Sequence, residues 1–238
     1  MNSIDVLVFA AHPDDAEIGC GGTIIKCSEQ GRRVVVVDFV RGELGTRGNA
    51  ETRQRESEAA SHMLGLHARE NLGLVDGDIR NTLNAKRQVA DAVRRWRPRA
   101  AFLPYWIDRH PDHANASCLA YDGTFLAGLP RFETGNPPFR PSRVYYYMGW
   151  EAFDPTFIVD VSDQARRKME AIHAYSTQFR PEGWDGPQTR LTQPSTDRRI
   201  RSRMAYYGSL IDRSYGEGFL IRGRLAVEDP LTLSFSSF

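Results

Sequence analysis

The sequence predicts an α/β protein in which a mostly parallel sheet carries helices on both faces. Strand-like and helix-like segments alternate along the chain, as expected when crossover helices join parallel strands. Two strand segments, 4–11 and 32–40, contain long apolar runs, which are typical of strands buried on both faces. The length of 238 residues fits one domain over 1–238.

Each expected strand is a short apolar run, and most of the expected helices carry a start or stop signal. The strands occupy 4–11, 32–40, 69–72, 100–106, 143–150 and 156–161. The helices occupy about 14–30, 50–64 and 82–96, followed by two amphipathic helices with apolar faces at Ala165, Met169 and Ile172 and at Ile200, Met204, Tyr207 and Ile211. Gly31 and Gly65 stand where the first two helices should end, and Pro98 ends the third. The order predicts a Rossmann-like sheet with right-handed crossovers.

Two segments rich in proline, glycine and polar residues are expected to be surface loops. Residues 128–142 contain four prolines and form a long connection between strands. Residues 176–197 precede the last helix, and their composition is typical of a mobile loop that can close over a site.

The composition argues against a general nucleic-acid or membrane surface. The formal net charge is +1, whereas such surfaces need a basic excess on one face. The first apolar stretch is too short for a signal peptide or a membrane span, which predicts a cytoplasmic protein. Three cysteines (Cys20, Cys27 and Cys118) without a CxxC motif fit reduced structural thiols.

The tripeptide His-Pro-Asp occurs twice, in HPDD at His12–Asp15 and in HPDH at His110–His113. Each copy follows an expected buried strand. One copy alone is more often a helix-start turn than a functional site. Because reactive groups gather beyond the carboxyl ends of parallel strands, the two copies are expected to meet in space and to form a metal centre.

Two histidines and one carboxylate make a three-ligand site that leaves positions open for water and substrate. The i, i+3 spacing lets His12 and Asp15 point the same way, and His113 is the natural third ligand. Asp14 must diverge from its neighbour, so it stays beside the metal as a free carboxylate suited to act as general base. His110 remains unligated and able to assist a developing oxyanion or a leaving amine. The ion could be Zn²⁺ or Fe²⁺.

Other classes of protein remain open at this point. A non-haem iron oxygenase could use the same ligands, although the spare carboxylate suits hydrolysis better. A nucleotide-dependent Rossmann enzyme needs a phosphate-binding glycine turn, but GCGGTI lacks the final glycine of GxGxxG and His12 occupies the turn. A non-catalytic sugar-binding module has no need for Asp14.

The motifs AHPDDAEIGCGGT and DRHPDH resemble those of the LmbE-like (PIG-L) family of zinc-dependent N-acetylglucosamine deacetylases. Further segments follow in the order seen in the bacillithiol-biosynthesis branch: RGEL…ETRQRE, RENLGLVDG, PYWIDRHPDHANA, VYYYM, FIVDVSD, AIHAYSTQF and EGF. The resemblance covers nearly the whole chain and implies that the acetyl group of N-acetylglucosaminyl-malate is removed. Other N-acetylglucosamine derivatives, free disaccharides and amide-linked sugar–thiol conjugates are alternative substrates.

The resemblance also implies a role for each of eight residues. They are zinc ligands (His12, Asp15, His113), a base (Asp14), a transition-state partner (His110) and substrate contacts (Glu43, Arg53, Arg109). Arginines facing the malyl carboxylates would be well matched to them. Relatives commonly form hexamers, so a homo-oligomer that binds a small amino-sugar substrate is expected. The family often supplies a tyrosine from the loop before the last helix; TRLTQPSTD has none, and Trp184, Gln193 or Ser195 could replace it.

Overall fold

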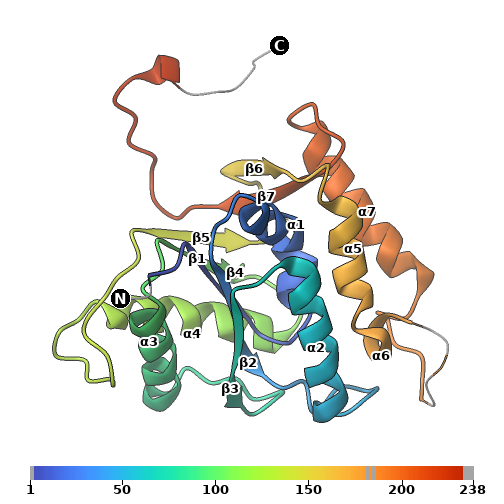
Figure 1. Cartoon of the computed structure of the whole chain (residues 1–238), viewed down its shortest axis with the longest axis horizontal. Helices are drawn as coiled ribbons and strands as arrows, with labels where there is room; N and C mark the ends of the chain where they lie inside the picture. The colour runs from blue at the N-terminus through green and yellow to red at the C-terminus, as the bar shows by residue number, and fades with distance from the viewer. Residues whose placement is uncertain (1–2, 181–182, 184–185, 233–238) are drawn as a thin grey trace.

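A computed structural model describes residues 3–180, 183 and 186–232, and within these residues seven strands form one sheet (Figure 1). The strands are β1 (Val6–Ala10), β2 (Val34–Val40), β3 (Ala68–Leu74), β4 (Ala100–Pro104), β5 (Arg143–Tyr147), β6 (Phe157–Asp160) and β7 (Gly216–Leu220). Their order across the sheet is β3-β2-β1-β4-β5-β7-β6. β1 to β5 pair in parallel, and β7 runs antiparallel to both of its neighbours. The predicted mostly parallel α/β fold is confirmed.

Helices cover both faces of the sheet (Figure 1). They are α1 (Asp15–Glu29), α2 (Ala50–Leu64), α3 (Leu83–Trp96), α4 (Pro111–Ala127), α5 (Ala165–His173), α6 (Ser176–Phe179) and α7 (Pro194–Ser209). α3 and α4 pack together on one face, whereas α1, α2 and α5 pack together on the other. Alternate residues of β2 enter the two apolar cores: Val35 and Val37 face α3 and α4, and Val34 and Val36 face α1. This two-sided burial explains the continuous apolar run in the sequence.

Several helix ends follow the expected local chemistry. The Thr82 side chain accepts a hydrogen bond from the Ala85 amide at the start of α3. Asn49 caps α2 in the same way through the Thr52 amide. Gly65 ends α2 with a φ of 70°, a left-handed conformation that glycine adopts without steric cost.

The helix α4 and the strand β7 are not expected from the sequence pattern. The small and apolar side chains of α4 are distributed all around the helix, so no single apolar stripe marks it as amphipathic. β7 has the sequence GEGFL, in which two glycines hide the alternation of a strand. Both elements become stable through tertiary packing.

The expectation of a surface loop over 176–197 is wrong at both ends. Residues 176–179 form the buried helical turn α6, and α7 already begins at Pro194. The turn is fixed because Glu56 on α2 accepts hydrogen bonds from the Thr177 amide (2.7 Å) and hydroxyl (2.8 Å). By contrast, residues 128–142 contain no helix or strand, as expected.

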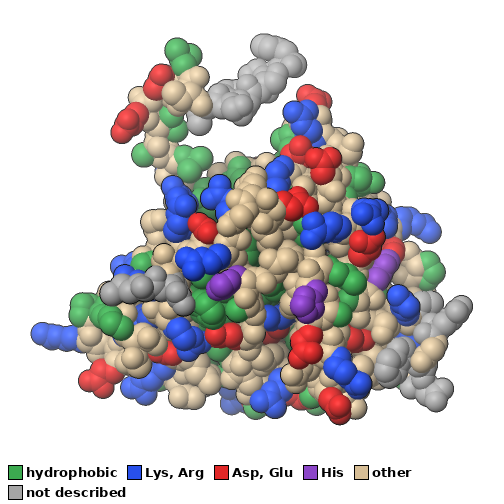
Figure 2. Space-filling model, in the orientation of Figure 1, with side chains coloured by type: hydrophobic (Ala, Val, Ile, Leu, Met, Phe, Trp, Pro, Cys, Tyr) green, Lys and Arg blue, Asp and Glu red, His purple; other side chains and the backbone are tan. Residues whose placement is uncertain are grey.

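The chain beyond β7 leaves the body of the protein. Residues 221–232 form an arm that projects from the sheet, as Figures 1 and 2 show. Apolar and acidic side chains both lie on this arm (Figure 2). Among the helices in the described ranges, none has the length and apolar character that crossing a bilayer requires.

Candidate active site

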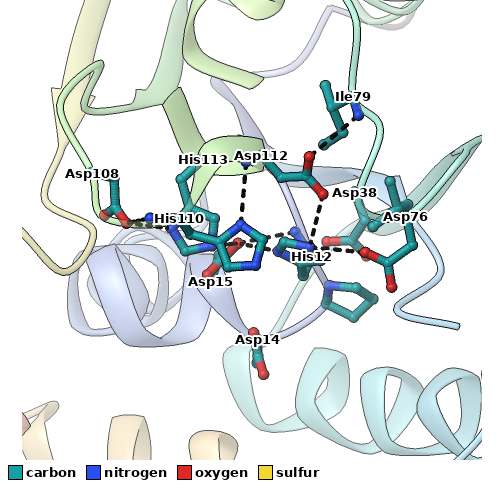
Figure 3. A network of polar contacts seen from close by, with 12 residues as sticks. His12, Asp14, Asp15, Asp38, Asp76, Ile79, Asp108, His110, Asp112 and His113 are labelled. Atoms are coloured by element: carbon teal, nitrogen blue, oxygen red, sulfur yellow. Dashed lines mark hydrogen bonds and ion pairs between the residues drawn. The ribbon is translucent and has the colours of Figure 1, made fainter. Parts of the chain in front are cut away.

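The two His-Pro-Asp motifs meet because β1 and β4 are neighbours in the sheet. These strands pair in parallel from Val6 and Ala100, so the loops that follow them emerge side by side at one edge. The His12 ring centroid lies 4.9 Å from that of His110 and 5.4 Å from that of His113. Segments about a hundred residues apart in sequence therefore form one cluster (Figure 3).

Three side chains of the cluster fit a divalent cation. His12, Asp15 and His113 each offer one ligand atom, and these atoms lie within 4.8 Å of one another. Asp15 Oδ2 is 3.4 Å from His12 Nδ1 and 3.3 Å from His113 Nε2. Burial on its own would raise the pKa of Asp15, but His113 and His12 lower it below its usual value. An ionised carboxylate between two imidazoles is a donor set that suits Zn²⁺ or Fe²⁺.

A second group, His12, His110 and Asp112, also brings its ligand atoms within 4.8 Å. Asp112, however, already accepts hydrogen bonds from the Gly77 amide (2.8 Å) and the Ile79 amide (3.3 Å). Its carboxylate ties α4 to the loop after β3. The set that contains Asp15 is therefore the better metal site.

Asp14 points away from Asp15 and from the histidine rings (Figure 3). It precedes α1 with a φ of 123° and makes no side-chain capping bond. Its Oδ2 lies 3.4 Å from both terminal nitrogens of Arg53, which is itself buried and donates to the Pro13 carbonyl at 2.7 Å. Burial raises the pKa of Asp14 to about 7, although Arg53 acts to lower it. A carboxyl group with such a pKa can exchange a proton near neutral pH.

His110 has one ring nitrogen engaged by the backbone. Its Nδ1 accepts a hydrogen bond from the Asp112 amide at 3.2 Å, so Nε2 carries the proton of the neutral ring. Burial lowers the pKa of His110, and the nearby His113 and His12 lower it further. The residue lines the same cavity as the three candidate metal ligands and can donate a hydrogen bond there.

The cavity measures about 360 Å³ and extends from the donor set to residues near α6 and α7. Its wall includes Arg53, Arg109, Trp150, Gln178, Arg190 and Leu191. The guanidinium carbons of Arg109 and Arg199 lie 5.3 Å and 5.5 Å from the Trp150 ring centroid. Partial burial lowers the pKa of Arg109, and the nearby positive charges of Arg190 and Arg199 lower it further.

Not every residue expected from the resemblance lines this cavity. Glu43 is exposed, and its Oε1 accepts from the Asp76 amide at 3.3 Å, so its place in a sugar pocket stays a prediction. Of the candidates for the missing tyrosine, Trp184 lies outside the described residues. Neither Gln193 nor Ser195 belongs to the cavity wall as far as the structure describes it. The closing movement expected of this segment also stays a prediction.

Asp108 is a site residue that the sequence does not single out. Its carboxylate accepts from the Trp150 amide (2.7 Å) and the His110 amide (2.9 Å), and it lies 3.1 Å from His113 Nδ1. A carboxylate behind a histidine ligand fixes the ring and its tautomer. The only signal in the sequence is local: an aspartate side chain often accepts a hydrogen bond from the amide two residues later, which is an Asx turn, and here that amide belongs to His110.

We expect Asp108→Asn to weaken metal binding about 10- to 100-fold, the usual effect of losing such a carboxylate. Asparagine keeps the size, but it cannot accept from His113, His110 and Trp150 as an ionised carboxylate does. Competition with a chelator measures the metal affinity directly. The exposed Asp163→Asn serves as the control, and equal affinities in the two variants would contradict this role.

The chain is similar in sequence and fold to several known proteins. Residues 7–122 match the family model "PIG-L: GlcNAc-PI de-N-acetylase". The conserved protein TT1542 from Thermus thermophilus is 35% identical, with a TM-score of 0.87 over 97% of this chain and 100% of that one. N,N'-diacetylchitobiose deacetylase from Pyrococcus horikoshii is 27% identical, with a TM-score of 0.81 over 92% and 83% of the two chains. Diacetylchitobiose deacetylase from Thermococcus kodakarensis is 29% identical over 228 residues, which are 90% of this chain and 81% of the relative. The chain belongs to the PIG-L family of de-N-acetylases.

Proposed function

We propose that the protein is a metal-dependent hydrolase that removes the acetyl group from an N-acetylglucosaminyl conjugate. One observation carries the proposal: a buried carboxylate, Asp14, lies in the same cavity as the donor set of His12, Asp15 and His113 but points away from it. Hydrolysis needs such a spare base, whereas an oxygenase does not. Family membership and the deacetylase relatives support the same reaction.

The chain's own groups divide the work of amide hydrolysis. A Zn²⁺ or Fe²⁺ ion held by His12, Asp15 and His113 would polarise the acetyl carbonyl and make water more acidic. Asp14 accepts the proton of the water whose oxygen bonds to the carbonyl carbon. His110 donates a hydrogen bond from Nε2 to the oxyanion that forms. Asp14 then returns the proton to nitrogen as the C–N bond breaks, which releases acetate and a free amine.

The arginines at the far end of the cavity favour a substrate with an anionic aglycone. Arg109 and Arg190 line the cavity, and Arg199 lies against the same tryptophan as Arg109. Guanidinium groups held near one another repel, and carboxylates between them relieve that repulsion. We therefore favour N-acetylglucosaminyl-malate, as in bacillithiol biosynthesis, over neutral N-acetylated sugars.

Acetate release from a panel of substrates tests the reaction. The metal-loaded protein is incubated with N-acetylglucosaminyl-malate, diacetylchitobiose, N-acetylglucosamine and an amide-linked sugar–thiol conjugate. We expect acetate and free amine in equal amounts, without oxygen consumption, and the highest kcat/KM for the malyl compound. Absence of acetate from every substrate would refute the deacetylase, and oxygen-dependent turnover would favour the oxygenase.

Arg109→Ala and Arg190→Ala are each expected to raise KM for the malyl substrate about 10-fold or more, the value of a charge-assisted hydrogen bond. The KM for diacetylchitobiose should change far less, since that sugar is neutral. The exposed Arg55→Ala on α2 is the matched control. An equal increase in KM for the two substrates would show that these arginines do not bind the carboxylates of the aglycone.

A further inference from the structure

A second hollow, distinct from the active site, lies at the opposite edge of the sheet. It measures about 320 Å³ and is lined by Val6 and Ala100, the first residues of β1 and β4, whereas the active site follows the last residues of these strands. Its other walls come from α1, β5, β6 and β7. The catalytic residues described above have no part in it.

The floor of this hollow is aromatic. Phe102, Tyr145, Phe157 and Phe219 pack in a cluster whose ring centroids lie 5.1 to 5.7 Å apart, and they define what we call the aromatic groove. Binding of apolar side chains in such a groove is favourable, because it removes apolar surface from water.

The rim of the aromatic groove is basic. Lys26, Arg32, Arg99 and Arg143 line it, together with the carboxylate of Asp5. Asp5 lies 3.4 Å from Arg99, which leaves the balance of charge around the groove positive. The chemistry therefore fits an occupant with apolar side chains and neighbouring carboxylates.

The C-terminal arm, 221–232, has this chemistry. Leu225, Val227 and Leu231 are 61%, 41% and 91% exposed, respectively. Glu228 and Asp229 follow directly after Val227. The arm projects from the body (Figures 1 and 2), so its aliphatic side chains are left in water within a single copy.

The start of the arm lies on the face of the sheet opposite the groove. The Arg222 guanidinium lies over the rings of Trp106, Tyr121 and Tyr146, at 4.3, 4.7 and 4.9 Å from their centroids. Tyr146 belongs to the core on the α3 and α4 side, whereas Phe102 and Phe219 belong to the core on the α1 side. These contacts direct the arm away from its own groove.

We propose that the arm of one copy docks in the aromatic groove of a second copy of this chain. Leu225 and Val227 enter the apolar floor, and Glu228 and Asp229 face the basic rim. Mutual exchange of arms buries both patches in a closed, twofold arrangement. The proposal is independent of the reaction and gives the expected homo-oligomer a specific contact.

Cysteine cross-linking tests the docking, because the natural Cys27 lines the groove. Leu225→Cys and Val227→Cys are made separately in a Cys118→Ser background, which removes the exposed thiol. After oxidation with copper–phenanthroline, we expect one or both proteins to run as covalent dimers that a reductant reverses. Adding Cys27→Ser must abolish the dimer. Monomer bands from both variants, with or without an internal disulfide, overturn the proposal.

Light scattering provides a second measurement. Deletion of 224–238 is expected to lower the mass in solution by about half or more, as loss of an exchanged contact requires. Replacing both acidic residues, Glu228→Lys with Asp229→Lys, should weaken the association in the same direction, and more strongly at low salt. Circular dichroism checks that the truncated chain is folded. A folded, truncated protein of unchanged mass would also overturn the proposal.

Discussion

Asp14→Asn is expected to lower kcat at least ~100-fold, the usual contribution of a general base, while the protein keeps its metal. The amide has the shape of the carboxylate but cannot accept the proton of the attacking water. Asparagine and aspartate have nearly the same size and similar backbone preferences, so the backbone before α1 should be preserved. Because Asp14 points away from the donor set, His12, Asp15 and His113 are unaffected.

Two measurements on purified protein decide this prediction. Steady-state kinetics with the best substrate of the panel gives kcat, and elemental analysis gives the metal content. Asp78→Asn, a change at an exposed aspartate on the loop after β3, is the matched control. Unchanged turnover in the Asp14 variant would remove this residue from the reaction, and loss of metal would make it a ligand instead.

His113→Ala is expected to lose the metal itself and, with it, all measurable turnover. The substitution removes one of the three proposed ligands, and it also leaves the partly buried Asp15 and Asp108 without the imidazole that lies 3.3 Å from one and 3.1 Å from the other. Removing a hydrogen-bonding partner from partly buried carboxylates is costly, so the folded protein should also melt at a lower temperature.

Elemental analysis after dialysis measures the metal content. Thermal melts with and without added Zn²⁺ measure how far metal binding stabilises the folded protein. The wild type should melt at a higher temperature in the presence of Zn²⁺, because a ligand that binds the native state stabilises it. The variant should not respond. His62→Ala, on the exposed face of α2, is the control. A variant that retains full metal content would exclude His113 as a ligand.

The centre of the sheet and the meeting of the two motifs follow from simple regularities. Apolar runs identify β1, β2 and β4, and the parallel order places the loops after β1 and β4 at one edge. His12, Asp15 and His113 could therefore be grouped from the sequence pattern. The i, i+3 spacing aligns His12 with Asp15, and because adjacent residues at a helix start diverge, Asp14 could be expected to point in another direction.

Other parts of the site depend on tertiary contacts that have no sequence period. Trp150 and Arg190 reach the cavity from irregular segments, and only the folded chain brings them next to Arg109. Asp108 acts through three acceptor contacts that no spacing rule predicts together. The turn at α6 is not predicted because the contacts that hold it come from Glu56, more than a hundred residues earlier.

The backbone at Asp14 has a consequence for how this protein can evolve. Arg97 and Asp212 also have positive φ among the described non-glycine residues, but both lie near the common left-handed region at 49° and 53°. Asp14, at 123°, lies outside it, in a conformation that costs roughly 1–3 kcal/mol in a side-chain-bearing residue. Glycine at this position would relieve the strain, but it would also leave the buried Arg53 guanidinium without its carboxylate partner. Heat resistance alone therefore favours glycine only together with a change at Arg53. A library screened only for heat resistance should enrich such inactive double variants, and a screen that couples survival to turnover should not.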